Sequence, residues 1–211
     1  MADSQPSDAP GAAGLVPGVN EQVLPVEPVV GAEAATGFAG QSNIIDPWIF
    51  NNYVQAPQGE FTISPRNAPG EVLLRLKLDP SINPYLAHLS RMYNGWAGGM
   101  SVQLMLAGNA FSAGKVIVAL LPPGLDPSDV TVLGATAFPH VIADVRTLEP
   151  IVLTVPDIRN IIYHENHQVD TTSTLLVMLY TPLRANNGGA DEFVVSGRLL
   201  TRPEPDFGFM F

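Results

Sequence analysis

Cysteine is absent from this 211-residue chain. Disulfides, a thiolate zinc site and a cysteine nucleophile are therefore excluded, and burial and subunit contacts must supply the stability. The absence is consistent with folding in a reducing cytoplasm. Long apolar runs are also absent: none approaches the roughly 18 residues of a membrane-spanning helix, so no membrane partner is expected. The first ten residues lack the basic start and apolar stretch of a secretory signal, and Ala2 stands where myristoylation needs glycine.

Basic residues are missing from the first 46 positions, which hold six acidic residues within a chain of net charge −10. A basic arm would neutralise a packaged nucleic acid, because phosphate contacts supply most of the sequence-independent affinity. An acidic arm cannot do this, and the net charge of the chain repels a polyanion. The first 46 residues are therefore not expected to bind a nucleic acid.

Residues 1–46 have the composition of a flexible, extended N-terminal arm. Ala, Gly and Pro fill 19 of these 46 positions, and residues 23–30 read Val-Leu-Pro-Val-Glu-Pro-Val-Val, in which the prolines disfavour a helix. Two interpretations stay open: a solvated linker, or a valine-rich segment that docks on a neighbouring surface. The dense apolar run at residues 44–50 marks the start of the folded domain, which we predict over residues 47–205.

The rest of the sequence predicts an all-β fold with eight short strands separated by Gly, Pro and Asn turns. Only two interruptions are helical, one after the second strand and one after the fourth. This order is typical of an eight-stranded antiparallel jelly-roll sandwich with two short helical insertions. The strands are predicted at residues 60–64, 71–78, 101–107, 115–121, 141–146, 151–155, 174–181 and 192–202.

Alternating side chains indicate which strand faces are buried. In the second strand four apolar residues point one way and two basic residues the other, namely Val72, Leu74, Leu76 and Leu78 against Arg75 and Lys77. The fourth and seventh strands are apolar on both faces, so their outer faces need a cover. The N-terminal arm, the helical insertions or another subunit could supply it.

Capping residues bound the two helical insertions. The first is predicted to begin at Asn83, an N-cap followed by Pro84, and to close at Gly95. The second is predicted to begin at Asp126 and to span about two turns that include Val130 and Leu133.

Two short motifs resemble chemical sites but miss essential parts of them. Residues 108–115 resemble a phosphate-binding loop, yet five residues separate the glycines, Val116 replaces the magnesium-binding hydroxyl, and a strand follows where a helix is required. A tight hairpin between strands is the better interpretation. His164 and His167 lie three residues apart in a polar loop without a third ligand, so they are expected to face solvent and not to bind a metal.

Enzyme chemistry finds no other support in the sequence. The histidine–glutamate spacing of a cupin metal site and the Gly-x-Ser-x-Gly elbow are both absent. His140 is expected to be a buried or interfacial histidine. Asp144 and Glu149 flank Arg146 in a pattern typical of charge pairing at a strand edge and not of an acid–base pair. We therefore predict no catalytic, cofactor or metal site and no enzymatic activity.

Seven motifs, in the same order along the chain, resemble the shell domain of the calicivirus major capsid protein, and in particular that of noroviruses. They are IDPWI at 45–49, QAPQGEFTISPRN at 55–67, MYNGW at 92–96, LAGNAF at 106–111, FPHV at 138–141, DVRTLEP at 144–150 and MLYTPLR at 178–184. The resemblance spans nearly the whole chain, and only the arm before Gln41 is loosely alike.

This resemblance implies a capsid shell protein that assembles through dimers into an icosahedral particle, with T=3 symmetry in the family, and encloses the RNA genome. It implies an arm on the inner surface, assembly in the host cytoplasm and a place in the virion. The doubly apolar strands would then be covered by further copies. In the family a hinge and a protruding, glycan-binding domain follow the shell; we interpret residues 206–211 as the start of that hinge, expect a truncation there, and expect no receptor binding by this chain.

Large or charged side chains beside turns are our candidates for subunit interfaces. They lie at the arm junction, after the first helix, and near the fifth strand: Pro47, Trp48, Phe50, Trp96, His140 and Arg146. For the aromatic residues, core packing is the alternative. A jelly-roll glycan-binding module is the alternative for the whole chain, and it would remain a monomer or dimer.

Overall fold

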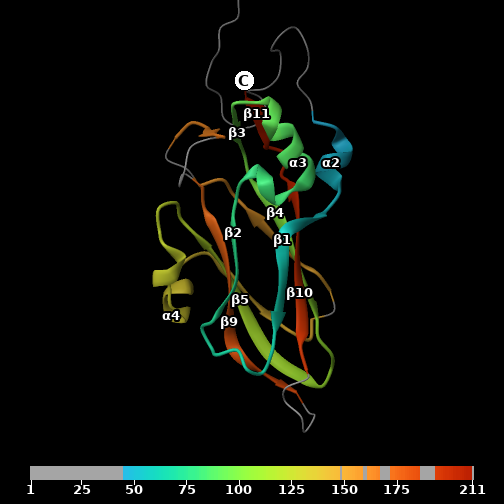
Figure 1. The fold of residues 1–211 in the computed structure, drawn as a ribbon, viewed down its shortest axis with the longest axis vertical. Coiled ribbons are helices and arrows are strands. Elements are labelled where there is room, and N and C mark those ends of the chain that lie inside the picture. The colour runs from blue at the N-terminus through green and yellow to red at the C-terminus, as the bar shows by residue number, and fades with distance from the viewer. Residues whose placement is uncertain (1–44, 148, 159–160, 167–171, 186–192, 211) are drawn as a thin grey trace, which may run out of the picture.

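The computed structural model describes residues 45–147, 149–158, 161–166, 172–185 and 193–210. The prediction of an arm over residues 1–46 therefore lies almost entirely outside the described residues. In the described part, two four-stranded antiparallel sheets pack face to face, and a small three-stranded sheet stands at one end (Figure 1). None of the helices in these described ranges is long and apolar enough to cross a membrane.

All eight predicted strands are present, and the chain passes repeatedly between the two larger sheets, with β5 and β6 as the one consecutive pair of these eight that stays in the same sheet. One sheet has the order β1 (Val54–Ile63), β10 (Val195–Pro203), β4 (Met100–Ala107), β7 (Ile151–Val155). The other has the order β2 (Val72–Lys77), β9 (Thr174–Ala185), β5 (Ser112–Leu121), β6 (His140–Asp144). Each of the pairs β1–β2, β4–β5, β6–β7 and β9–β10 crosses from one sheet to the other. The jelly-roll prediction is confirmed.

Three short strands that the sequence did not predict bring the count to eleven. They are β3 (Gly95–Ala97), β8 (His164–Glu165) and β11 (Gly208–Met210), and they pair in the order β11-β3-β8. Strands of two or three residues are too short for alternation to reveal them. Residues 206–211 were predicted to start a hinge, and the structure places Gly208–Met210 of this segment in a strand that pairs with β3.

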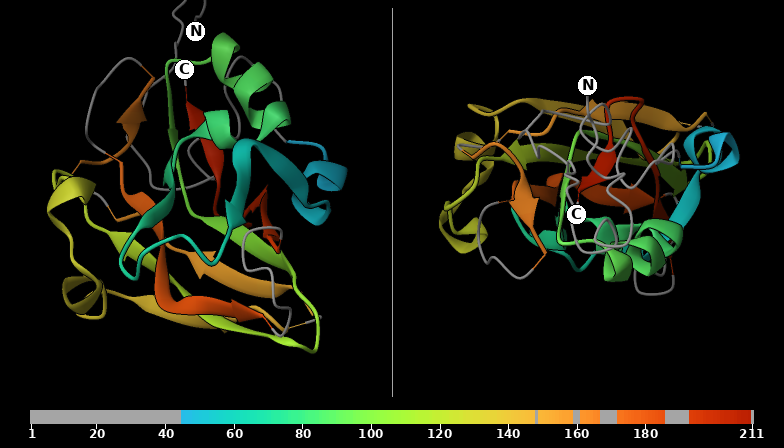
Figure 2. Two further views of the ribbon diagram at one scale, coloured as in Figure 1. Left: turned by 60° about the horizontal axis from the view of Figure 1, so that its bottom comes forward. Right: turned by 90° about the horizontal axis from the view of Figure 1, so that it is seen from above.

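The main core lies between the two larger sheets, whose strands Figure 2 shows from two further sides. Val116 and Val118 of β5 and Val177 of β9 point into it and are at most 1% exposed. Phe61 of β1 lies across from Gly197 of β10, where a Cβ atom would stand 2.2 Å from the phenyl Cζ. Glycine at this position lets the aromatic ring fill the space between the sheets.

The outer faces of β5 and β9 are covered by the insertion that follows β5. Ile117, Leu121 and Leu176 are fully buried there against Ala135 and partly buried side chains of residues 125–138. This insertion contains the short helices η6 (Pro127–Asp129) and α4 (Val132–Ala135), and Figure 1 shows α4 beside the sheet. Of the three covers that the sequence left open, the helical insertion is the one observed. The expectation that further copies cover these strands is wrong.

Helix caps agree with the sequence in one insertion and differ in the other. The side chain of Asn83 accepts hydrogen bonds from the backbone of Tyr85 and Leu86, so α3 (Pro84–Leu89) begins as predicted. Its end was predicted wrongly, because Gly95 belongs to β3. In the second insertion Asp126 caps η6 and Thr131 caps α4. The remaining short helices are α2 (Pro47–Asn51), η4 (Pro80–Ile82) and η5 (Ser90–Met92).

An irregular register in β2 overturns part of its predicted alternation. Leu74 and Leu76 pack in the main core as expected, but Val72 packs in the outer cluster with the β5 insertion. The pairing with β9 shifts between Val72 and Leu74, and an extra residue at such a bulge moves the preceding side chain to the opposite face.

The loop at residues 108–111 connects two sheets and is not a hairpin. It joins β4 to β5, which lie in different sheets. The Asn109 side chain accepts a hydrogen bond from the backbone N–H of Phe111 at 2.9 Å, and the Ser112 hydroxyl donates to the Asn109 carbonyl at 2.7 Å. The segment is therefore a closed turn before a strand, with no helix N-terminus to hold a phosphate.

Candidate assembly surfaces

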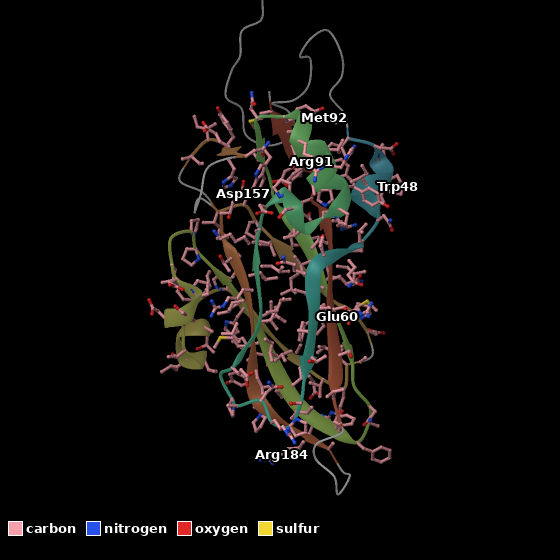
Figure 3. The ribbon with its side chains drawn as sticks, viewed as in Figure 1. Trp48, Glu60, Arg91, Met92, Asp157 and Arg184 are labelled. Carbon is pink, nitrogen blue, oxygen red and sulfur yellow. The ribbon has the colours of Figure 1, made fainter. Side chains whose placement is uncertain are left out.

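The arm junction presents aromatic side chains on the surface. The carboxylate of Asp46 accepts the backbone N–H of Trp48 at 3.0 Å and starts α2. Trp48 is 51% exposed at the surface (Figure 3). Its ring meets that of Tyr85 of α3 edge to face, with ring centroids 4.7 Å apart. Pro47 is exposed, whereas Phe50 packs partly against the main core. Pro47, Trp48 and Tyr85 are therefore free to contact another chain.

His140 and Arg146 both lie on the surface near β6. The Nδ1 atom of His140 is 2.8 Å from the Phe138 carbonyl, and the side chain is exposed, not buried. Arg146 forms an ion pair with Asp144 at 3.1 Å, and Lys115 of β5 approaches the same carboxylate at 3.3 Å. Hydrogen bonding to Arg146, helped by Lys115, holds the pKa of Asp144 well below its usual range. This confirms the predicted charge pairing of Asp144 and Arg146.

Trp96 lies in the interior of the small sheet. Its ring stacks on His164 at a centroid distance of 4.3 Å and on Phe207 at 5.8 Å. Only 4% of the residue is exposed, so Trp96 offers a neighbouring subunit almost no surface. Core packing, the alternative for the aromatic candidates, describes this position.

A buried histidine–aspartate pair lies beneath Trp96. His164 is 1% exposed, and its Nε2 atom is 2.6 Å from a carboxylate oxygen of Asp157; the other oxygen accepts the backbone N–H of Gly98 at 3.1 Å. The prediction that His164 faces solvent is wrong, and His167 lies outside the described residues. Asp157 had no local signal, because no sequence pattern marks its contact with His164 seven positions further on, and its other partner, Gly98, lies 59 positions away. The described residues contain no group of three potential metal ligands among His, Asp and Glu.

Exposed apolar side chains also occur at positions that the sequence did not predict. Phe111 on the β4–β5 turn is 76% exposed and Leu133 on α4 is 83% exposed. Ile142 of β6, Val152 of β7 and Ile158 are 40%, 53% and 40% exposed. Strand alternation could have placed Ile142 and Val152 on outer faces, but it does not reveal that their two strands lie at sheet edges.

The fold and surface define a jelly-roll β-sandwich protein, a class that includes viral coat subunits, lectins and cupins. A family model described as "Calicivirus coat protein" matches residues 1–211. The chain belongs to the calicivirus coat protein family.

The relatives narrow the resemblance to noroviruses. Capsid protein VP1 of Lordsdale virus is 61% identical over 214 residues, which cover 99% of this chain and 39% of that protein. Capsid protein VP1 of the Norwalk strain of human norovirus is 56% identical over 211 residues, 100% of this chain and 40% of that protein. The chain thus spans about two fifths of the length of these relatives.

Solved structures agree in fold. A chain of the T=3 VLP of human norovirus GI.7 Houston strain has 58% sequence identity and a TM-score of 0.76, over 89% of this chain and 38% of that chain. A chain of sacbrood virus of honeybee has a TM-score of 0.65 at 14% identity, over 77% of this chain and 85% of that chain, and so shares the fold alone.

Proposed function

We propose that this chain forms the continuous shell of an icosahedral viral capsid, by assembly of many copies of itself through dimers, and that the shell encloses an RNA genome. The observation that supports this most directly is the likeness, in both sequence and fold, to a chain of a T=3 norovirus VLP. In this function the protein acts as a structural subunit and not as an enzyme. The protein would be located in the virion and, during assembly, in the host cytoplasm.

The charge distribution supports assembly by protein contacts and not by condensation on RNA. The chain has ten basic residues, and some of those that the structure describes already have carboxylate partners: Lys115 and Arg146 share Asp144, and Arg198 pairs with Glu60 at 3.2 Å. With a net charge of −10, the subunit holds RNA inside by enclosing it rather than by attracting it. Receptor glycan binding is not part of the proposed function of this chain.

Five of the predicted interface residues remain our candidates for contacts between copies. Pro47, Trp48 and Phe50 lie at the arm junction, and His140 and Arg146 lie near β6. Hydrogen–deuterium exchange of assembled and dissociated protein would reveal burial at residues 46–50 and 138–146. Equal exchange rates of these segments in both states would show that they do not lie in the interface.

Negative-stain microscopy of the purified chain tests the proposed function. We expect hollow, closed particles of uniform diameter, because each subunit must bury lateral surface against copies of itself. A monodisperse population of monomers or dimers under all conditions tried would instead favour the glycan-binding module and contradict the shell.

Acidic repulsion predicts how the particles respond to pH and salt. At high pH and low ionic strength the like charges of neighbouring subunits repel with little screening, so the particles are expected to loosen, and mild acid is expected to stabilise them. Light scattering in low salt at pH 6 and pH 9, each repeated with added salt, measures the effect. Particles equally stable in both low-salt buffers would show that net charge does not govern assembly.

A further inference from the structure

One flank of the sandwich has two unpaired strand edges. β6 and β7 follow one another in sequence but are the edge strands of different sheets. Within the described ranges β6 pairs only with β5, and β7 only with β4. Each strand therefore presents free backbone donors and acceptors along its outer edge, which is a template for pairing with another extended chain.

An apolar cleft of about 310 Å³ lies between these two edges. Its inner wall is formed by Val118, Leu120 and Leu175, which belong to the main core. Val152 and Ile158, 53% and 40% exposed, line its mouth. Covering this cleft would remove apolar surface from water and is therefore favourable.

Among the described residues, two polar side chains line the cleft. They are His140 at the start of β6 and Thr154 on β7. A lining with so few polar groups suits an apolar, extended occupant that can also use the free strand edges.

The chain itself contains a segment with this chemistry in its N-terminal region. Residues 23–30 include two prolines, which disfavour a helix and are tolerated in a strand at a sheet edge. Alternate side chains of a β-strand share a face, so this segment, docked as a strand, would present Leu24, Val26, Pro28 and Val30 on one wholly apolar face and Glu27 on the other. That face matches the cleft.

The tether between this segment and the folded domain is long enough. Fifteen positions separate residue 30 from Ile45, and an extended chain of that length spans about 50 Å, more than the diameter of a domain of this size. Because each proline lacks an N–H group, pairing with a strand edge is incomplete, and the apolar face supplies most of the attraction.

We propose that residues 23–30 of a copy of this chain dock in the cleft between β6 and β7. The inference rests on the proposed function, in which arms and clefts of many copies are brought together. It assigns the cleft a role as an arm-docking site that closes the open flank of the sandwich.

Site-directed disulfide crosslinking of the full chain tests this proposal. Because the natural sequence has no cysteine, a Val26→Cys, Ile158→Cys double variant contains only the two introduced thiols. Under mild oxidation the 26–158 disulfide is expected to form about tenfold faster than the disulfide of a Val26→Cys, Leu133→Cys control, because docking raises the effective concentration of the thiols. Leu133 is more exposed than Ile158 and does not line the cleft, so access alone would favour the control.

Mixing chains that carry one cysteine each identifies the copy that supplies the arm. A Val26→Cys chain crosslinked to an Ile158→Cys chain means that the arm of one copy docks on another, whereas a crosslink confined to the double variant means that each arm docks on its own domain; both support the cleft as the site. Equal rates for the 26–158 and 26–133 pairs would overturn the proposal. Predominant 158–158 crosslinks would also overturn it, in favour of direct contact between the flanks of two copies.

Failure of this inference can be told apart from failure of the proposed function. Microscopy of the same samples shows whether particles form. Normal particles with crosslinking at the control rate would reject arm docking in this cleft and leave the shell function intact.

Discussion

Replacing Phe207 with alanine is expected to lower the free energy of unfolding by about 3–5 kcal/mol, the usual cost of removing a large buried aromatic side chain. Phe207 is fully buried, lies beside Trp96 at 5.8 Å and meets Phe209 edge to face at 5.2 Å. Its loss leaves a cavity in the main core beside the rings of Trp96 and Phe209. Urea unfolding of the dissociated protein, followed by tryptophan fluorescence, measures the effect.

Phe111→Ala is the matched control for this prediction. Phe111 is 76% exposed on the β4–β5 turn, so its removal creates no cavity and is expected to change stability by less than about 0.5 kcal/mol. A destabilisation of similar size in both variants would show that the segment around Phe207 is not packed as described.

Replacing Asp157 with alanine is expected to cost about 3 kcal/mol, since it removes one partner from a buried polar pair. The carboxylate accepts hydrogen bonds from the backbone N–H of Gly98 and lies 2.6 Å from His164 Nε2. Without it these groups, held beneath Trp96, lose an acceptor that water cannot readily replace. The same unfolding experiment, combined with near-ultraviolet circular dichroism to report on the packing of Trp96, measures the loss.

Asp144→Ala separates the effect of burial from that of removing a charge. Asp144 also has a basic partner, but its side chain is 23% exposed and its partner Arg146 is 54% exposed. Solvent screens that ion pair. Asp144→Ala is therefore expected to lower the free energy of unfolding by less than roughly a third as much as Asp157→Ala. Equal losses in the two variants would contradict a structural role specific to the buried pair.

The regular part of the fold could be predicted from the sequence because local patterns determine it. The side chains of β4 and β5 alternate or run apolar over eight and ten residues, long enough for the period of a strand to be visible. Asn83 followed by Pro84 predicts the start of α3, because a cap acts through neighbouring backbone groups. The seven motifs then identified the family.

The site predictions were correct only where the interacting residues are near neighbours in the sequence. Asp144 and Arg146 are two positions apart in the sequence, and their ion pair was predicted correctly. Trp96, His164 and Asp157 meet from three separate segments, and no spacing in the sequence shows that a polar loop histidine is buried under a tryptophan. The bulge between Val72 and Leu74 could not be predicted either, since its register depends on the partner strand β9.

Composition and local patterns were enough to establish the all-β class, the order of the eight long strands, the absence of cysteine chemistry and the acidic character of residues 1–46. These follow from composition and from periods of a few residues. Only the tertiary structure decided that the β5 insertion covers the doubly apolar strands, that residues 207–210 belong to the folded domain, and that β6 and β7 leave an apolar cleft open between them. Each of these depends on which distant segments become neighbours, and that is fixed by packing between the sheets rather than by local preference.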